Sequence, residues 1–264
     1  MEERRPSDLT GSISFDRAAE YYDLTRGLPD RLMDQLVPRL VAELPPRGLC
    51  LEIGVGTGRI ALPLMRRGVD VVGVDISLAM LHRFVEKSPA ARIAVADATR
   101  LPFRDGTFAS AVASHVLHLI PEWRHALDEL ARVIVPGGVL IASRGADSRV
   151  DWQTEIRRRF FSEAGDPSRP PGINRIDDLD EEMRARGATV RVVEDVRNEG
   201  TASISDLLAA LEQGIWSACW SIDEESRRRA AAATQRWAAS QYGDLDEPRP
   251  TRQSSDWRAY RLAQ

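Results

Sequence analysis

A glycine-rich turn between an apolar run and a helical pattern constrains this chain more than any other feature. Residues 48–53 are typical of a short buried strand, and the turn Gly54-Val55-Gly56-Thr57-Gly58 follows directly. From Arg59 onward, apolar residues recur at helical spacing. Glycines suit such a turn because it needs positive φ angles and leaves no room for a Cβ beside a ligand. The backbone N–H groups that open the helix can then meet an anionic or polar ligand.

Strands and helices alternate from this turn onward. Apolar runs predict strands at 48–53, 69–74, 92–96, 108–113 and 139–143, with helices near 58–67, 77–87 and 122–135. Two more strands are predicted, at 189–196 and 257–262, and the last is expected to be an antiparallel edge strand. We therefore expect an α/β fold, with a doubly wound, mostly parallel seven-stranded sheet covered by helices on both faces.

The composition predicts a soluble globular protein. Of the 264 residues, 43% are hydrophobic and 29% are charged, which allows a packed core. The two cysteines, Cys50 and Cys219, are too few for a disulfide framework. No apolar run could span a bilayer, and the N-terminus lacks the apolar segment of a signal peptide. We expect a cytoplasmic protein without a membrane partner, and the net charge of −4 argues against a nucleic-acid partner.

Acidic residues stand at the ends of three successive predicted strands, at Glu52, Asp75 and Asp97. In a doubly wound sheet these ends line one crevice, so one extended ligand could contact all three carboxylates. Asp75 follows the glycine turn at about the distance from which an acidic residue accepts the hydroxyls of a ribose. The pattern predicts a nucleoside ligand, although a solvated loop residue or a helix cap is the alternative for each carboxylate taken singly.

Two nucleoside cofactors compete for this crevice. A dinucleotide site requires the spacing G-x-G-x-x-G, whereas Arg59 stands here in the place of that third glycine. A carboxylate at Glu52 would repel a pyrophosphate but attract an ammonium group. S-adenosylmethionine is a nucleoside that carries an α-amino group, and we therefore favour it over NAD.

The same segments resemble the motifs of class I S-adenosylmethionine-dependent methyltransferases of the small-molecule branch. Leu51 to Gly58 is similar to the first motif and Val71 to Ser77 to the second. Ala96 to Phe103 resembles the adenine-contacting segment, and Phe15 to Arg26 resembles the N-terminal lid of that branch. One departure is Ala109, where the family often has an acidic residue that supports the structure.

The resemblance implies a role for individual residues. Glu52 would bind the methionine ammonium, Asp75 the ribose hydroxyls and Asp97 the adenine amine. Further cofactor contacts are implied for Arg26, Gly54, Gly56, Gly58, Ile76, Met80, Ala98 and Ser114. Arg26 is the candidate for the methionine carboxylate because a guanidinium can bind it bidentately, although a surface arginine is the alternative.

The catalytic residues are less constrained by the pattern. Methyl transfer is an in-line displacement, so alignment and exclusion of water supply much of the acceleration. A general base is needed only if the acceptor carries a proton. His115 is the candidate base and Tyr22 the candidate for shaping the methyl pocket, with a packing role as the alternative for both. No histidine, cysteine or carboxylate cluster has metal-ligand spacing, so no metal is expected.

These inferences predict a single methyltransferase domain over residues 1–264. A helical lid is expected at 14–45, the cofactor-binding core at 48–143, and helical insertions that cover the acceptor at 147–175 and 203–242. The expected function is transfer of a methyl group to an oxygen, nitrogen or carbon atom of a small organic acceptor. A non-catalytic S-adenosylmethionine-binding regulator or partner protein and an NAD-dependent oxidoreductase are the alternatives. The acceptor and the oligomeric state do not follow from the sequence.

Overall fold

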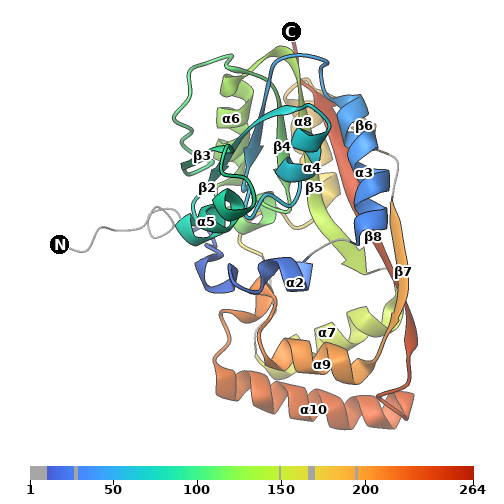
Figure 1. Ribbon diagram of the computed structural model, residues 1–264. Coiled ribbons are helices and arrows are strands. Elements are labelled where there is room, and N and C mark those ends of the chain that lie inside the picture. The colour runs from blue at the N-terminus through green and yellow to red at the C-terminus, as the bar shows by residue number, and fades with distance from the viewer. Residues whose placement is uncertain (1–10, 27–28, 149, 166–169, 194–195) are drawn as a thin grey trace, which may run out of the picture. The chain divides into compact units, whose positions relative to one another are not determined.

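The computed structural model describes residues 11–26, 29–148, 150–165, 170–193 and 196–264 (Figure 1). The chain divides into two compact units. The first, which we call the sheet unit, comprises Met1–Gly145, Pro171–Val196 and Ser255–Gln264. The second, the helical unit, comprises Ala146–Pro170 and Arg197–Ser254. The glycine turn and all three strand-end carboxylates belong to the sheet unit.

The sheet follows the strand order β3-β2-β1-β4-β5-β8-β6. Its strands are β1 (Leu49–Ile53), β2 (Asp70–Asp75), β3 (Arg92–Val95), β4 (Phe108–Ser114), β5 (Ile134–Ser148), β6 (Thr189–Val192) and β8 (Arg249–Arg261). β1 pairs in parallel with β2 and β4, β2 with β3, and β4 with β5. Because β1 lies between β2 and β4, the chain reverses its winding direction beside the glycine turn. The predicted doubly wound sheet is confirmed.

Helices cover both faces of this sheet. One core cluster joins it to α3 (Asp30–Glu43), α4 (Ala61–Arg66) and α5 (Leu78–Lys87). Another joins it to α6 (Trp123–Val133) and α8 (Ile176–Ala185). The alternation of side chains along β1 explains this division, since Leu51 and Ile53 belong to one cluster and Cys50 to the other.

The predicted place of the last strand is wrong. β8 lies between β5 and β6 rather than at the edge of the sheet, and it begins at Arg249, well before the predicted start at residue 257. Its predicted antiparallel direction is confirmed by the pairing with β6 from Thr189–Arg261 to Val192–Arg258. Trp257 packs into one core cluster and Tyr260 into the other. A strand that is buried on both faces suits the interior of a sheet better than its edge.

The start of the helical lid expected at 14–45 also differs from a continuous helix. The structure has a short 3-10 turn, Asp16–Ala18, followed by the five-residue helix α2 (Tyr22–Arg26). The side chain of Ser14 donates to the Asp16 carboxylate, which in turn accepts a bond from Ser77 at the start of α5. Because Asp16 is held by a distant partner, the segment breaks into two short pieces.

The helical unit has a core of its own. It contains α7 (Asp151–Glu163), α9 (Ile204–Glu212) and α10 (Glu224–Tyr242), whose apolar faces share one cluster. The strand β7 (Arg197–Ala202) pairs antiparallel with β8 from Arg249 to Ser254. This strand was not predicted because its sequence, Arg-Asn-Glu-Gly-Thr-Ala, is polar throughout and shows no alternation of apolar side chains.

A buried polar contact fastens α8 to β8, and its loss should be measurable. Asp180 accepts a hydrogen bond of 2.8 Å from the Tyr260 hydroxyl and one of 3.1 Å from Arg258. Tyr260→Phe removes one donor from this buried carboxylate, so we expect the free energy of unfolding in urea to fall by about 1–2 kcal/mol. Tyr242→Phe is the control, since the Tyr242 hydroxyl bonds Glu155 at a partly buried place in the helical unit. Equal losses of unfolding free energy in Tyr260→Phe and Tyr242→Phe would contradict the expectation that burial strengthens the contact with Asp180.

Candidate active site

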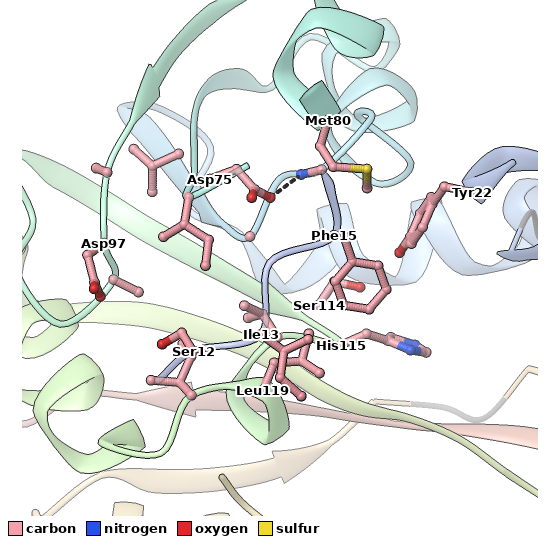
Figure 2. Close-up of a pocket in the computed structure, with 18 residues that line it drawn as sticks. Ser12, Ile13, Phe15, Tyr22, Asp75, Met80, Asp97, Ser114, His115 and Leu119 are labelled. Atoms are coloured by element: carbon pink, nitrogen blue, oxygen red, sulfur yellow. Dashed lines mark hydrogen bonds between the residues drawn. The ribbon is translucent and has the colours of Figure 1, made fainter. Parts of the chain in front are cut away.

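One pocket lies at the carboxyl edge of the sheet, where the strands β1, β2, β3 and β4 end. Its wall combines the glycine turn, the segments that follow β2, β3 and β4, and residues of the N-terminal segment. Figure 2 shows Asp75 and Asp97 toward one side of the pocket and Tyr22 and His115 toward the other. The pocket is therefore long enough to present carboxylates at one end and an aromatic and an imidazole ring at the other.

The glycine turn is tightly enclosed. Gly54 has a φ of 62°, and a Cβ there would clash with the side chain of Val116, which follows β4. Gly58 has a φ of 82°, and a Cβ there would lie 2.6 Å from the Phe84 ring of α5. Larger residues would therefore be strained at both positions and would push the turn away from its neighbours.

Asp75 is held by the turns on both sides of it. Its two carboxylate oxygens accept hydrogen bonds of 2.8 Å from the backbone N–H groups of Gly56 and Ser77. The pKa of Asp75 is raised to about 6, chiefly by burial and also by the nearby Asp16 carboxylate, whereas hydrogen bonds from the backbone N–H groups of Ser77, Gly56 and Ile76 oppose this rise. Each oxygen retains a lone pair, so the carboxylate is oriented and can still accept a bond from a hydroxyl group.

Glu52 is buried at the end of β1, with 2% of its surface exposed. Burial raises its pKa to about 8, against the influence of Arg59 and of a hydrogen bond from the Ala61 N–H. Among the residues that the structure describes, Oε2 of this carboxylate has no hydrogen-bond partner. Leaving a buried acceptor unsatisfied is costly, so this oxygen fits a ligand that brings a donor, above all a cationic one.

Asp97 is oriented by its own turn after β3. Its Oδ1 accepts hydrogen bonds of 2.8 Å from both the backbone N–H and the hydroxyl of Thr99. Ala98, which lies between these two residues, is buried and lines the pocket as well. The arrangement places a fixed carboxylate beyond Asp75, one strand further along the edge of the sheet.

His115 has a strained backbone at the opposite end of the pocket. Within the described ranges it is the only non-glycine residue with a positive φ, at 54°. Its backbone N–H donates to the Ser143 carbonyl, 2.9 Å away, which fixes the turn between β4 and the next 3-10 helix, Leu117–Leu119. Nearby, Phe15 and Tyr22 pack edge to face with their ring centroids 5.7 Å apart. Strain of this kind is often retained at functional sites.

Comparison with known proteins finds a methyltransferase domain in the central part of the chain. The family described as "Methyltransferase domain" matches residues 51–142, which hold the glycine turn, Asp75, Asp97 and His115. A demethylmenaquinone methyltransferase of Streptomyces avermitilis is 38% identical over 130 residues, 48% of this chain and 56% of that relative. Residues 51–142 of this chain therefore match a methyltransferase domain.

Two further comparisons concern another curated relative and a solved structure. A malonyl-[acyl-carrier protein] O-methyltransferase of Halorhodospira halophila is 34% identical over 166 residues, 59% of this chain and 53% of that relative. The crystal structure of the YcgJ protein of Bacillus subtilis matches 89% of this chain and all of its own length, with a TM-score of 0.61 and 15% identity. At this identity the likeness shows a shared fold alone. The chain spans little more than half the length of the curated relatives.

The structure brings most of the predicted site residues of the methyltransferase domain together. The predicted residues that line the pocket are Tyr22, Gly54, Gly56, Asp75, Ile76, Met80, Asp97, Ala98, Ser114 and His115. Glu52 and Gly58 are buried just before and within the glycine turn and do not line the pocket. Arg26 ends α2, and its side chain lies outside the described part of the structure.

The structure also adds residues that the sequence did not reveal. Ser12 and Ile13 line the pocket, and Arg59 donates to the Ser114 hydroxyl at 3.4 Å. No local signal marks them, because each reaches the site through a partner far along the chain.

In the described part of the chain, no helix has both the length and the apolar composition that a membrane span requires. Among those same residues, no group of three or more histidine, cysteine or acidic residues could hold a metal ion.

Proposed function

We propose that this protein transfers a methyl group from S-adenosylmethionine to a small organic acceptor. The observation that carries the proposal is Glu52, a buried carboxylate with an unpartnered oxygen immediately before the glycine turn. An ammonium group satisfies such an oxygen and favours ionisation of the carboxyl, whereas the pyrophosphate of NAD would oppose that ionisation. Bound S-adenosylmethionine supplies a methyl group that is already activated on a sulfonium.

Residues that line the pocket, together with Glu52 buried behind the glycine turn, would bind successive parts of the cofactor. Glu52 holds the ammonium end, Asp75 accepts from the ribose hydroxyls and Asp97 accepts from the adenine amine. Ile76 and Met80, which follow β2 and line the pocket, offer apolar contacts beside the base. This order follows the sequence of strand ends β1, β2 and β3 along the sheet.

His115 and Tyr22 would serve the acceptor. Both line the pocket away from Asp75 and Asp97 (Figure 2). In this role His115 removes a proton from an acceptor that carries one, and Tyr22 shapes the space in which the methyl group moves. The two relatives described above are named for different acceptors, demethylmenaquinone and a malonyl carrier protein. The acceptor atom therefore stays open among oxygen, nitrogen and carbon.

Calorimetric titration with S-adenosylhomocysteine and with NAD tests the proposal. We expect the wild-type protein to bind S-adenosylhomocysteine and not NAD. Asp75→Ala should weaken that binding by about 1–3 kcal/mol, because the ribose hydroxyls lose a buried charged acceptor. The thermal unfolding temperature of the variant, measured without ligand, controls for a loss of folding.

The two titrations separate the outcomes. Tight NAD binding without S-adenosylhomocysteine binding would overturn the proposed function in favour of an oxidoreductase. Binding of S-adenosylhomocysteine with equal affinity in Asp75→Ala would keep the cofactor but remove the ribose assignment. If the cofactor is bound and no acceptor in a metabolite extract gains a labelled methyl group, the protein binds without catalysing.

A further inference from the structure

The N-terminal segment, residues 12–26, forms one wall of the pocket. Ser12, Ile13, Phe15 and Tyr22 all line it. The backbone N–H of Ile13 donates to the Leu119 carbonyl at 3.1 Å, which ties the segment to the chain beyond β4. Figure 2 shows this segment crossing the view between Met80 and Leu119. A ligand that enters or leaves the pocket therefore depends on how firmly this wall is held.

The segment is fastened at the β2 end of the pocket by Asp16. One oxygen of its carboxylate accepts a hydrogen bond of 2.6 Å from the Ser77 hydroxyl and a longer one, 3.4 Å, from the Ala79 N–H. Ser77 is also the residue whose backbone N–H donates to Asp75. Asp16 thus attaches the wall to the turn that orients the proposed ribose-binding carboxylate.

The segment is fastened at the glycine turn by Asp23. The Thr57 hydroxyl donates to one carboxylate oxygen of Asp23 at 2.6 Å, and Lys87 lies 2.5 Å from the other. The Lys87 ammonium also donates to the Thr57 carbonyl at 3.0 Å. These three residues form a closed ring of contacts that joins α2, the glycine turn and the last residue of α5.

Thr57 connects this ring of contacts to the glycine turn beside the pocket. It is fully buried and stands between Gly56 and Gly58, so the hydroxyl and the carbonyl that take part in the ring both belong to the turn beside the pocket. An exposed ion pair by itself stabilises a protein little. Here the Lys87 and Asp23 side chains, which are 35% and 45% exposed, hold the five-residue helix α2 against a buried turn. A weak contact of this kind can be released without unfolding the sheet.

We propose that Asp23, Lys87 and Thr57 form a latch that holds the N-terminal segment over the pocket and sets the rate at which the cofactor leaves. The inference rests on the proposed function, since it concerns the same pocket. The three residues act through the segment and the glycine turn rather than through contact with the cofactor, and so they are positioning residues. Opening of the latch breaks the Asp23 contacts and leaves Lys87 bound to the Thr57 carbonyl.

The rate of S-adenosylhomocysteine dissociation tests the latch. Lys87→Met keeps the length of the side chain but removes the charge, and we expect dissociation to become about two- to five-fold faster in stopped-flow displacement. Lys87→Arg restores a cation and should return the rate toward that of the wild type. Arg83→Met is the matched control on the same helix, because Arg83 pairs with Glu86 and not with the N-terminal segment. Its dissociation rate should be unchanged.

A double variant and hydrogen exchange complete the test. If Asp23 and Lys87 act in one latch, Asp23→Asn combined with Lys87→Met should be no faster than the faster single variant. Amide exchange over residues 12–26 should accelerate in Lys87→Met and not in Arg83→Met, with the unfolding midpoint unchanged. A wild-type dissociation rate and wild-type exchange in folded Lys87→Met would overturn the latch. If the wild-type protein binds no S-adenosylhomocysteine, the proposed function fails, and exchange in the unliganded protein still decides whether the latch exists.

Discussion

Replacing Glu52 with glutamine is expected to weaken S-adenosylhomocysteine binding by roughly 10- to 100-fold, because a buried ionic hydrogen bond to the ligand ammonium is lost. Glutamine keeps the size of the side chain and leaves the glycine turn in place. Methylthioadenosine is the matched probe, since it has the nucleoside but no amino-acid group. Its affinity should be the same in the wild-type protein and in Glu52→Gln.

The pH dependence of ligand binding tests the role of Glu52 independently. Burial raises the pKa of Glu52 to about 8, so the free protein carries a neutral carboxyl at this position at pH 7. An ammonium ligand binds the ionised form, and binding must therefore release a proton. The affinity for S-adenosylhomocysteine should rise with pH between about 6.5 and 8, by up to ~10-fold per pH unit, and level off above the pKa.

Calorimetry in two buffers of different ionisation enthalpy measures that proton directly. At pH 7 we expect release of close to one proton per ligand in the wild-type protein and much less in Glu52→Gln. Asp75 contributes little at this pH, because its pKa is about 6. Methylthioadenosine, which lacks the ammonium group, should release no such proton on binding to the wild-type protein or to Glu52→Gln. A flat affinity for S-adenosylhomocysteine from pH 6.5 to 8 would remove Glu52 as the ammonium site.

The parts of the fold that the sequence predicted correctly depend on short-range signals. β1 and the glycine turn are encoded within ten consecutive residues, and the carboxylates of Asp75 and Asp97 follow their own strands directly. Since parallel strands end at one edge of the sheet, their order along the chain was enough to bring these residues to one pocket. The family resemblance then assigned the roles.

The features that were predicted wrongly, or not at all, depend on partners far along the chain. The interior place of β8 follows from its pairing with β6, which lies about 70 residues earlier, and from burial on both of its faces. β7 is polar and becomes a strand only because β8 pairs with it. No local pattern distinguishes an interior strand such as β8 from an edge strand, or a polar strand such as β7 from a loop.

The same reason explains why the N-terminal contacts were missed. Asp16 bonds Ser77, and Asp23 bonds Thr57 and Lys87, so each contact joins residues more than 30 positions apart. In the sequence these acids alternate with apolar residues of the predicted lid and are indistinguishable from solvated side chains. Only the folded chain shows that they reach the two turns that hold the pocket.

For catalysis, His115→Asn is expected to lower kcat by about 10²- to 10⁴-fold for an acceptor that carries a proton, as for loss of a general base. S-adenosylhomocysteine affinity should be unchanged. Turnover of methyl-labelled S-adenosylmethionine with the acceptor found in a metabolite extract provides the assay. His125→Asn is the matched control, because His125 lies on α6 with 67% of its side chain exposed.

The backbone of His115 decides which variants are informative. At a φ of 54°, alanine would add strain of its own, whereas asparagine and glycine both adopt this region readily. His115→Asn and His115→Gly therefore keep the turn after β4 and remove the imidazole. A loss of rate in both variants, with the acidic limb of the pH profile of kcat/KM abolished, assigns the effect to a proton-accepting ring. Wild-type rates in both would show that His115 packs against the pocket and that alignment alone carries the reaction.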